Sequence, residues 1–335
     1  MSFENKKTVK VKFVDFHKGF DPFNNDFYIN LSEKYNVVLS ENPDYLFYSV
    51  FGLEHLNYDC IRIFYTGECY TPNFNECDYA IGFDRLDFGD RYIRIPIYRM
   101  NQYKEAYKQL FNRKPFTKED LDKKEGFCSF VYSNCFAQSA RARMFDLLSR
   151  YKLVSSGGRY KNNIGGAVKD KNAFLNKHKF CIAFENASFA GYTTEKIVDA
   201  FAAYTLPIYY GDPDVIKDFN EKAFINCNNY SSLEEAIEYI KEIDQNDERY
   251  LRMMNENPLN QEYNENELRE FIYHIFDQDY LDAYRRTKSI TSNDYEKMLK
   301  RHQFFEKNIY PNYRKVMNQM KRIQSGTLLT SKRKK

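Results

Sequence analysis

The segment FENASFAGYTTEKIVDAFAAYTLPIYYGDP, residues 184–213, contains the pattern that decides the fold. An apolar run at 180–184 ends in Glu185-Asn186, a loop of small residues follows, and an amphipathic pattern at 194–204 predicts a helix. A second apolar run at 206–211 predicts another strand. A strand, a helix and a strand in this order predict a β-α-β unit with two parallel strands.

The first residues of this helix include two hydroxyls, a carboxylate and an ammonium group, from Thr193 to Lys196. A helix N-terminus has unpaired N–H groups and a partial positive charge, so it binds phosphate readily. Lys196 therefore has the wrong charge for its position, at a cost of about a few tenths of a kcal/mol unless an anion lies nearby. A bound diphosphate would remove this conflict. Helix chemistry alone leaves a second interpretation open, in which Lys196 points to solvent and Thr193 or Thr194 is an ordinary cap.

The alternation of strands and helices continues through most of the chain. Near-continuous apolar runs are typical of parallel strands covered on both faces, and we expect doubly wound α/β domains. The charged segment 101–125 predicts an interdomain boundary, and the chain from about 258 onward has a helical pattern. The strands are expected at 9–16, 35–40, 44–51, 61–68, 79–84, 91–96, 126–134, 152–156, 179–186, 206–211 and 223–227, and the later helices at 138–150, 170–178, 194–204, 214–219 and 231–243.

Composition excludes several classes of protein. Fifty Lys and Arg against 47 Asp and Glu give a formal charge of +3, too balanced for a nucleic-acid-binding protein. The seven scattered cysteines have no disulfide or zinc spacing and favour a reducing, cytoplasmic compartment. We expect no signal peptide and no membrane span. The basic end SKRKK (331–335) predicts at most weak association with an anionic membrane surface.

Other polar residues follow the expected strands, where ligands bind in open α/β sheets. Glu68, after the strand at 61–68, suits a general base or a surface turn. Arg141 and Arg143 suit phosphate contact or an exposed helix face. The glycine-rich loop 155–166 matches neither a dinucleotide fingerprint nor a P-loop.

Two acidic triplets, at 212–214 and 277–279, match the Asp-x-Asp metal signature of one sugar-transferase fold. Such triplets arise by chance in a charged chain, and Asp214 is expected to cap the following helix. The five histidines share no metal spacing. We therefore predict no metal site.

The order of these motifs is more specific than any one of them. The segment 184–213 closely resembles the α1,3-fucosyltransferase signature of glycosyltransferase family 10, with Phe-Glu-Asn, Gly-Tyr-x-Thr-Glu-Lys, Asp-Ala and Pro-Ile-Tyr-x-Gly-x-Pro in register. FYTGECYTPNFNECDYAIGFDRLDFGDRYIRIP (64–96) and GFCSFVYSNCFAQSARARMFDLL (126–148) resemble two further blocks of its bacterial members. The resemblance covers roughly residues 60–260.

The resemblance implies a GT-B fold, in which two Rossmann-like domains face a central cleft, with a helical C-terminal segment. The expected domains are 1–120 for the acceptor, 121–285 for GDP-fucose, and 286–335 for C-terminal helices and a basic tail. The family's motifs imply that Glu68 is the general base and that Glu195 assists catalysis. They imply a GDP-fucose site made of Arg141, Asn186, Tyr192, Glu195 and Lys196, in which Arg143 competes with Arg141 because of a spacing difference.

The implied reaction is an inverting transfer of L-fucose from GDP-β-L-fucose to the 3-hydroxyl of GlcNAc or Glc in a lactosamine- or lactose-type acceptor. Such transfer makes Lewis-antigen-like glycans of the bacterial lipopolysaccharide O-antigen or of glycosylated proteins. Lys and Arg can supply the positive charge, so no metal or other cofactor is required, although Mn²⁺ can stimulate. Expected partners are GDP-fucose and an oligosaccharide acceptor, and the expected location is the cytoplasm or the inner face of the cell membrane. The acceptor loops near 17–30 and 69–76 carry no readable code for the acceptor.

Two other functions remain open. One is a GT-B transferase that uses another nucleotide sugar, and the other is a carbohydrate-binding module without catalytic activity.

Overall fold

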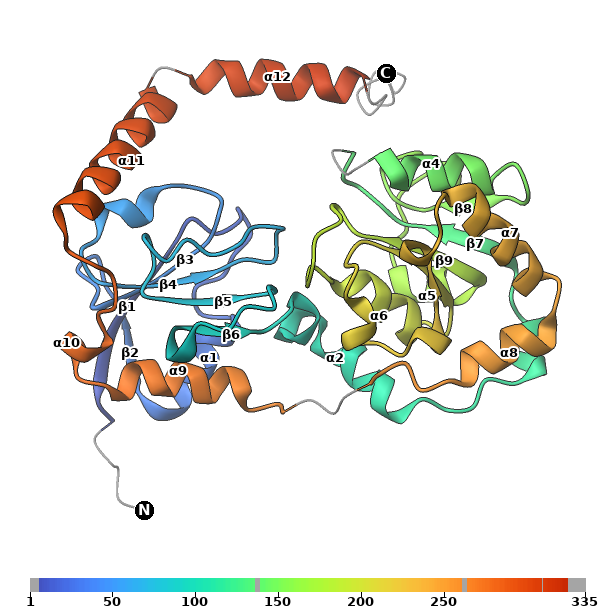
Figure 1. The fold of residues 1–335 in the computed structure, drawn as a ribbon, viewed down its shortest axis with the longest axis horizontal. Coiled ribbons are helices and arrows are strands. Elements are labelled where there is room, and N and C mark those ends of the chain that lie inside the picture. The colour runs from blue at the N-terminus through green and yellow to red at the C-terminus, as the bar shows by residue number, and fades with distance from the viewer. Residues whose placement is uncertain (1–5, 136–138, 261–263, 309, 325–335) are drawn as a thin grey trace. The chain divides into compact units, whose positions relative to one another are not determined.

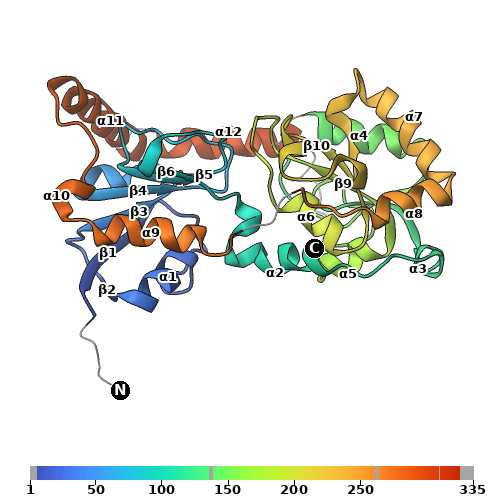
Figure 2. The ribbon, with the colours of Figure 1, turned by 60° about the horizontal axis from the view of Figure 1, so that its bottom comes forward.

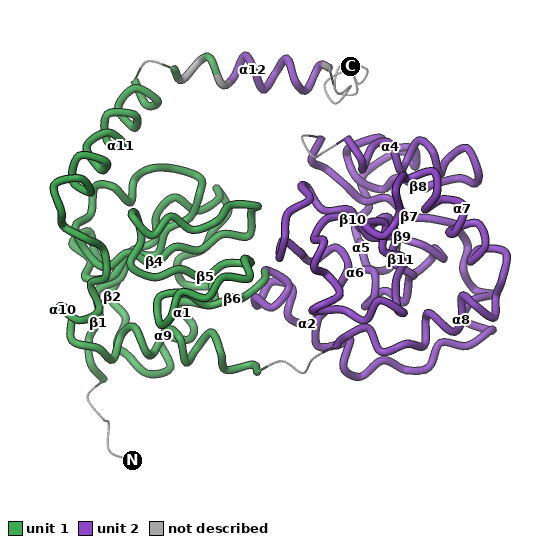
Figure 3. Tube along the Cα trace, in the orientation of Figure 1, with its two compact units in different colours: residues 1–96, 263–314 green, residues 97–262, 315–335 purple. Residues whose placement is uncertain are grey.

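The computed structural model describes residues 6–135, 139–260, 264–308 and 310–324. They form two compact units, shown in green and purple in Figure 3. Unit 1 consists of Met1–Pro96 and Tyr263–Arg314, and unit 2 of Ile97–Glu262 and Lys315–Lys335. Each unit has its own parallel sheet, which confirms the predicted α/β fold class.

The sheet of unit 1 has the strand order β2-β1-β3-β4-β5-β6, and all neighbouring strands are parallel. Helices α1 (Asp26–Lys34) and α9 (Glu267–Asp277) contact each other, and α9 packs on the sheet, where the ring of Phe276 stacks on Tyr45 at 4.0 Å (Figures 1 and 2). The strands are β1 (Thr8–Val14), β2 (Asn36–Leu39), β3 (Tyr45–Tyr48), β4 (Ile61–Tyr65), β5 (Tyr79–Gly82) and β6 (Tyr92–Arg94).

The sheet of unit 2 has the order β11-β10-β9-β7-β8 and is also parallel throughout. Both of its faces are covered, because Phe180, Ile182 and Phe184 of β9 pack with α4 and α7, whereas Cys181 packs with α5 and α6. This burial explains why the strands have continuous apolar runs. The strands are β7 (Gly126–Phe130), β8 (Val154–Ser156), β9 (His178–Phe184), β10 (Leu206–Tyr210) and β11 (Ile225–Asn226), and the helices are α2 (Asn101–Gln109), α3 (Lys118–Asp122), α4 (Ser139–Leu148), α5 (Lys171–Asn176), α6 (Glu195–Ala202), α7 (Leu233–Asp244) and α8 (Asp247–Asn255).

The units divide the chain at 96/97 and 262/263, whereas the expected boundaries were 120/121 and 285/286. The charged segment 101–125 belongs to unit 2, where α2 contacts α6 and Phe116 exchanges two backbone hydrogen bonds with the Asn255 side chain. The residues after 262 return to unit 1 through α9. They continue as α10 (Tyr280–Ala283), α11 (Ile290–Asn308) and α12 (Pro311–Gln324), which confirms the helical C-terminal segment.

Two local expectations were wrong. The end of the acceptor loop expected near 17–30, from residue 26 onward, belongs to α1, because the Asn25 side chain caps the first turn and Phe27 and Leu31 face the core. The helix expected at 214–219 is only a 3₁₀ turn, Val215–Lys217, and the Asp214 side chain makes no capping hydrogen bond to it. Within the described residues, no helix is both long and apolar enough to cross a membrane. The basic tail 331–335 lies outside the described residues.

Both sheets reverse their strand order at one point, between β1 and β3 in unit 1 and between β7 and β9 in unit 2. In doubly wound folds, ligands bind beside such a point, at the carboxyl ends of the strands. Figure 1 shows β7 and β9 side by side in unit 2. The residues that follow Phe130 and Phe184 are therefore candidates for a ligand-binding site.

Candidate active site

Glu185, the first residue after β9, organises the switch point of unit 2. Its side chain is buried, and one carboxylate oxygen accepts the N–H of Thr194 at 2.8 Å. The other oxygen accepts the Thr194 hydroxyl at 2.7 Å and the Lys196 ammonium at 3.0 Å. Thr194 is the residue before α6, so Glu185 ties the N-terminus of this helix to the end of β9.

Lys196 has its counter-ions within the protein, so its charge conflict is relieved without a bound anion and its side chain does not point to solvent. Its side chain is only 14% exposed and lies 3.0 Å from Glu185 and 3.5 Å from Glu195. Burial lowers the pKa of Lys196, but these two carboxylates outweigh burial and raise the pKa above its ordinary value. The ammonium is thus charged and fixed in place before any ligand binds. A hydrogen bond of 2.6 Å to the Thr194 hydroxyl completes its position.

Gly211 explains why the Phe-Glu-Asn and Tyr-Tyr-Gly-Asp-Pro motifs occur together. A Cβ atom at this position would lie 2.5 Å from Cγ of Glu185, so any side chain would displace the carboxylate. Asp212, also buried, accepts the Gly191 N–H at 2.7 Å and the Thr193 hydroxyl at 3.0 Å. It therefore braces the loop before α6. Among the described residues, no cluster of three or more His, Cys, Asp or Glu side chains could hold a metal ion.

Arg141 of α4 lies at the same end of the sheet. Its guanidinium donates to Oδ1 of Asn186 at 2.6 Å and to the Phe184 carbonyl at 3.1 Å, and it lies 3.9 Å from the centre of the Tyr132 ring. Its Nε is buried and has no hydrogen-bond partner in the described part of the chain. Arg143 is instead 61% exposed and pairs with Glu234 at 2.7 Å, so only Arg141 belongs to the site.

Tyr192 and Glu195 flank the start of α6. Tyr192 is buried in the turn before the helix, while the Glu195 side chain is 19% exposed. Burial raises the pKa of Glu195, but the ammonium groups of Lys196 and Lys171 outweigh it and hold the pKa below its ordinary value. Glu195 is therefore an ionised carboxylate beside a fixed cation.

Glu68 belongs to the other unit. It follows β4 at the carboxyl edge of the unit 1 sheet, its side chain is exposed, and its backbone N–H donates to the Thr66 hydroxyl at 3.0 Å. The structure thus groups Arg141, Asn186, Tyr192, Glu195 and Lys196 in unit 2 and places Glu68 at a strand end of unit 1.

The sequence interpretation did not identify Glu185 or Gly211 as site residues. The signal was a carboxylate directly after a buried strand, followed by a helix start with an unexplained lysine. Their pairing could not be predicted, because the contact between the two side chains depends on the course of the loop at 187–193.

The chain is similar to known proteins over most of its length. The family model described as "Alpha-(1,3)-fucosyltransferase FucT N-terminal domain" matches residues 11–101, and that described as "Glycosyltransferase family 10 (fucosyltransferase) C-term" matches residues 121–276. A crystal structure of an α1,3-fucosyltransferase is similar with a TM-score of 0.71 and 32% identity, covering 87% of this chain and 95% of that chain. A structure of such an enzyme with GDP-fucose has a TM-score of 0.68 and 32% identity, covering 87% and 94%.

Curated relatives agree over shorter stretches. The α-(1,3)-fucosyltransferase FucT of Helicobacter pylori is 40% identical over 272 residues, which cover 71% of this chain and 57% of that protein. The human 4-galactosyl-N-acetylglucosaminide 3-α-L-fucosyltransferase 9 is 31% identical over 145 residues, covering 42% and 39%. The chain thus spans about half the length, or less, of these relatives. The two matching domains, their motifs in register and the similar fold establish that this chain belongs to glycosyltransferase family 10, the fucosyltransferases.

Proposed function

We propose that the protein is an inverting α1,3-fucosyltransferase. It transfers L-fucose from GDP-β-L-fucose to the 3-hydroxyl of GlcNAc or Glc in an acceptor of the lactosamine or lactose type. The observation that carries this proposal is the buried Glu185–Thr194–Lys196 network, which fixes a cation at a helix N-terminus beside Arg141. The solved relative with GDP-fucose supports the choice of donor.

The pre-formed network leaves capacity for a diphosphate. An ammonium group has three N–H donors, and Lys196 uses two of them, on Glu185 and on the Thr194 hydroxyl. The Lys196 ammonium, the positive end of α6 and the guanidinium of Arg141 provide positive charge at one strand edge. A diphosphate leaving group gains negative charge as its bond to fucose breaks, and fixed donors stabilise that charge without reorganisation.

The reaction then needs one proton acceptor. In the proposed step, the acceptor 3-hydroxyl attacks C1 of fucose from the face opposite GDP, and its proton moves to the carboxylate of Glu68. The bond between C1 and the β-phosphate oxygen breaks with its electron pair on GDP. Glu195, as an ionised carboxylate, binds sugar hydroxyls or stabilises positive charge on the fucose ring. Transfer requires no metal in this scheme, and Mn²⁺ acts at most as a stimulant.

The products we propose are Lewis-antigen-like glycans of a bacterial lipopolysaccharide O-antigen or of glycosylated proteins. The proposed location is the cytoplasm, with at most weak peripheral association with the inner face of the cell membrane. Helix α12 supports such association, because Tyr313, Val316, Met317, Met320 and Ile323 are exposed with helical spacing and its last turn is basic.

The test is incubation with GDP-fucose and a panel of lactose, N-acetyllactosamine and its β1,3-linked isomer, followed by mass and linkage analysis. We expect addition of one fucose at the 3-hydroxyl of GlcNAc or Glc, with α linkage. GDP-mannose is the control donor. GDP release from GDP-mannose in preference to GDP-fucose, or no transfer to any acceptor, would contradict the proposal.

A further inference from the structure

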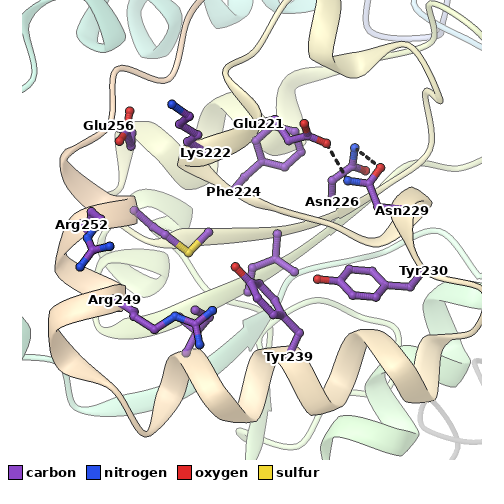
Figure 4. A pocket seen from close by; sticks show the side chains of 13 residues that line it. Glu221, Lys222, Phe224, Asn226, Asn229, Tyr230, Tyr239, Arg249, Arg252 and Glu256 are labelled. Carbon is purple, nitrogen blue, oxygen red and sulfur yellow. Dashed lines mark hydrogen bonds between the residues drawn. The ribbon is translucent and has the colours of Figure 1, made fainter.

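A second pocket lies in unit 2, away from the residues assigned to the donor. It has a volume of about 390 Å³ and is bounded by the sheet edge at β11, the adjoining 3₁₀ turns η6 (Glu221–Ala223) and η7 (Cys227–Asn229), and helices α7 and α8 (Figure 4). Small-molecule sites typically have volumes of roughly 300–1,000 Å³. The pocket therefore has room for a small ligand.

One wall of the pocket is aromatic. The rings of Tyr230 and Tyr239 lie 5.9 Å apart at an angle of 39°, and Figure 4 shows the two side chains next to each other on one side of the pocket. The guanidinium of Arg249 lies 5.4 Å from the centre of the Tyr239 ring and is held there by Glu242 at 3.1 Å. Both tyrosines are only partly buried, so the wall retains exposed apolar area.

The opposite wall is a chain of amide and carboxylate groups. Asn229 donates to Glu221 at 2.6 Å, and the buried Asn226 donates to the Asn229 side chain at 3.4 Å, as the dashed lines of Figure 4 show. Within the described residues, the second oxygen of Glu221 and the hydroxyl of Tyr230 have no hydrogen-bond partner. These groups are fixed and can still accept or donate hydrogen bonds.

The charge of the pocket disfavours an anion. The two arginines that line it are each paired with a glutamate, Arg249 with Glu242 at 3.1 Å and Arg252 with Glu248 at 3.3 Å. Lys222 adds one positive charge to the lining, and Glu221 and Glu256 add two negative charges. When Glu242 and Glu248 are included, four carboxylates offset three cationic side chains, so the lining has no excess of positive charge to attract an anion.

An aromatic wall that faces amide and carboxylate groups matches the chemistry of a pyranose ring, which has an apolar C–H face and a polar rim of hydroxyls. We propose that this pocket is a second carbohydrate site, which binds one or two neutral pyranose residues of a glycan. The site lies at the outer strand of the sheet, and the Asn228 side chain of η7 donates a hydrogen bond of 3.1 Å to the carbonyl of Asp212, the residue that braces the loop before α6. The proposal goes beyond fucosyl transfer, because a neutral sugar binds here without any donor.

The experiment is hydrogen–deuterium exchange of the full chain, saturated with GDP, with and without millimolar N-acetyllactosamine or a tetrasaccharide of two such units. We expect protection of 221–230 and 236–253. Tyr239→Ala should require about tenfold more sugar for the same protection, because one aromatic contact is lost. Asn229→Ala, which changes a more exposed side chain, should also weaken it. Tyr280→Ala, at a tyrosine of unit 1 that is 40% exposed, is the matched control and should have no effect.

GDP affinity, measured by calorimetry, should stay unchanged in all three variants and shows that unit 2 is folded. The proposal is overturned if neither sugar protects these segments, or if both pocket variants keep the protection of the unmodified chain. Tighter binding of a sialylated acceptor than of its neutral counterpart would overturn the assignment to neutral sugars. Fucose transfer is measured separately, so loss of either proposal leaves the other testable.

Discussion

Glu185→Gln is the sharpest test of the site, because it removes one charge from the centre of the network and keeps the size of the side chain. In the unmodified protein the carboxylate accepts three hydrogen bonds, and the side chains of Glu185 and Lys196 are 0% and 14% exposed. A glutamine can still accept the Thr194 N–H with its carbonyl oxygen. Its NH₂ group, however, would face the Lys196 ammonium, which can only donate, and the Thr194 hydroxyl, which would lose the acceptor of its own proton.

The expected cost follows from these contacts. Removing one partner of a buried ion pair costs about 3–5 kcal/mol, because the other charge remains buried. Lys196 keeps Glu195 at 3.5 Å and is slightly exposed, which places the expected loss near the lower end, at about 3 kcal/mol. This corresponds to roughly a hundredfold change in an opening equilibrium.

The assay is native-state hydrogen exchange of the β9 and α6 amides, since a chain with two units need not unfold in one step. Exchange should accelerate about a hundredfold in Glu185→Gln. Glu234→Gln is the matched control, because it removes an ion pair of similar length whose side chains are 61% and 51% exposed, and it should change exchange little. Adding Lys196→Met to Glu185→Gln should restore part of the loss. Equal effects of the two Glu→Gln variants would refute the buried pair.

Three further perturbations test other contacts. Gly211→Ala should destabilise unit 2 by about 1–3 kcal/mol in thermal unfolding. Gly166→Ala is the control and should not, because its Cβ would meet nothing within 4 Å. Equal melting temperatures of the two variants would count against the close approach of Gly211 to the Glu185 carboxylate. Glu68→Gln should lower kcat by about 100-fold or more at unchanged GDP affinity, and near-normal turnover in this variant would exclude Glu68 as the base. Lys196→Ala should weaken GDP binding itself. His55 is paired with two carboxylates that outweigh burial and raise its pKa. Its contribution to stability is therefore complete below about pH 6.5 and is lost as pH rises through the folded pKa. The stability difference between the unmodified chain and His55→Gln should shrink from pH 6 to pH 9, and a constant difference would contradict this.

The strands could be predicted from the sequence because each is a short, nearly continuous apolar run, and the eleven strands of the described residues lie within or close to the expected ranges. The burial of Arg141 rather than Arg143 could also be predicted from the sequence. Arg141, Met144 and Leu148 are the buried residues of α4 and have the spacing of one helix face, on which Arg143 does not lie. The missed helix α1 had a similar signal, since Phe27 and Leu31 follow a capping Asn25.

Domain boundaries and ion pairs could not be predicted in the same way, because they depend on which surfaces meet. The segment 101–125 has the composition of a linker, but Phe116 and Leu121 are buried in the core of unit 2. Helix α9 is amphipathic, and nothing in its own pattern says which sheet its apolar face covers. Lys196 and Glu185 are likewise joined only by the folded loop between them.

Both units contain a carboxylate that follows a strand and accepts hydrogen bonds from the start of a later helical turn. In unit 1, Asp15 follows β1 and accepts the backbone N–H groups of Glu54 and His55, each at 2.9 Å, at the start of a 3₁₀ turn. It also pairs with the His55 side chain at 2.7 Å. A Cβ on Gly52 would lie 2.2 Å from its carboxylate, just as Gly211 makes room for Glu185.

Each unit therefore places a buried carboxylate after a strand, a basic side chain at the next turn or helix, and a glycine beside them. The difference is the basic residue. Lys196 stays charged throughout the physiological range, whereas His55 titrates when the pH rises through its folded pKa. His55 also contacts Glu76 at 3.2 Å, which in turn accepts the Tyr295 hydroxyl of α11, so the loop after Glu68 is tied to the C-terminal helices through a group that can lose its charge. Increasing pH should therefore loosen this connection in unit 1 while Lys196, at the start of α6 in unit 2, keeps its charge.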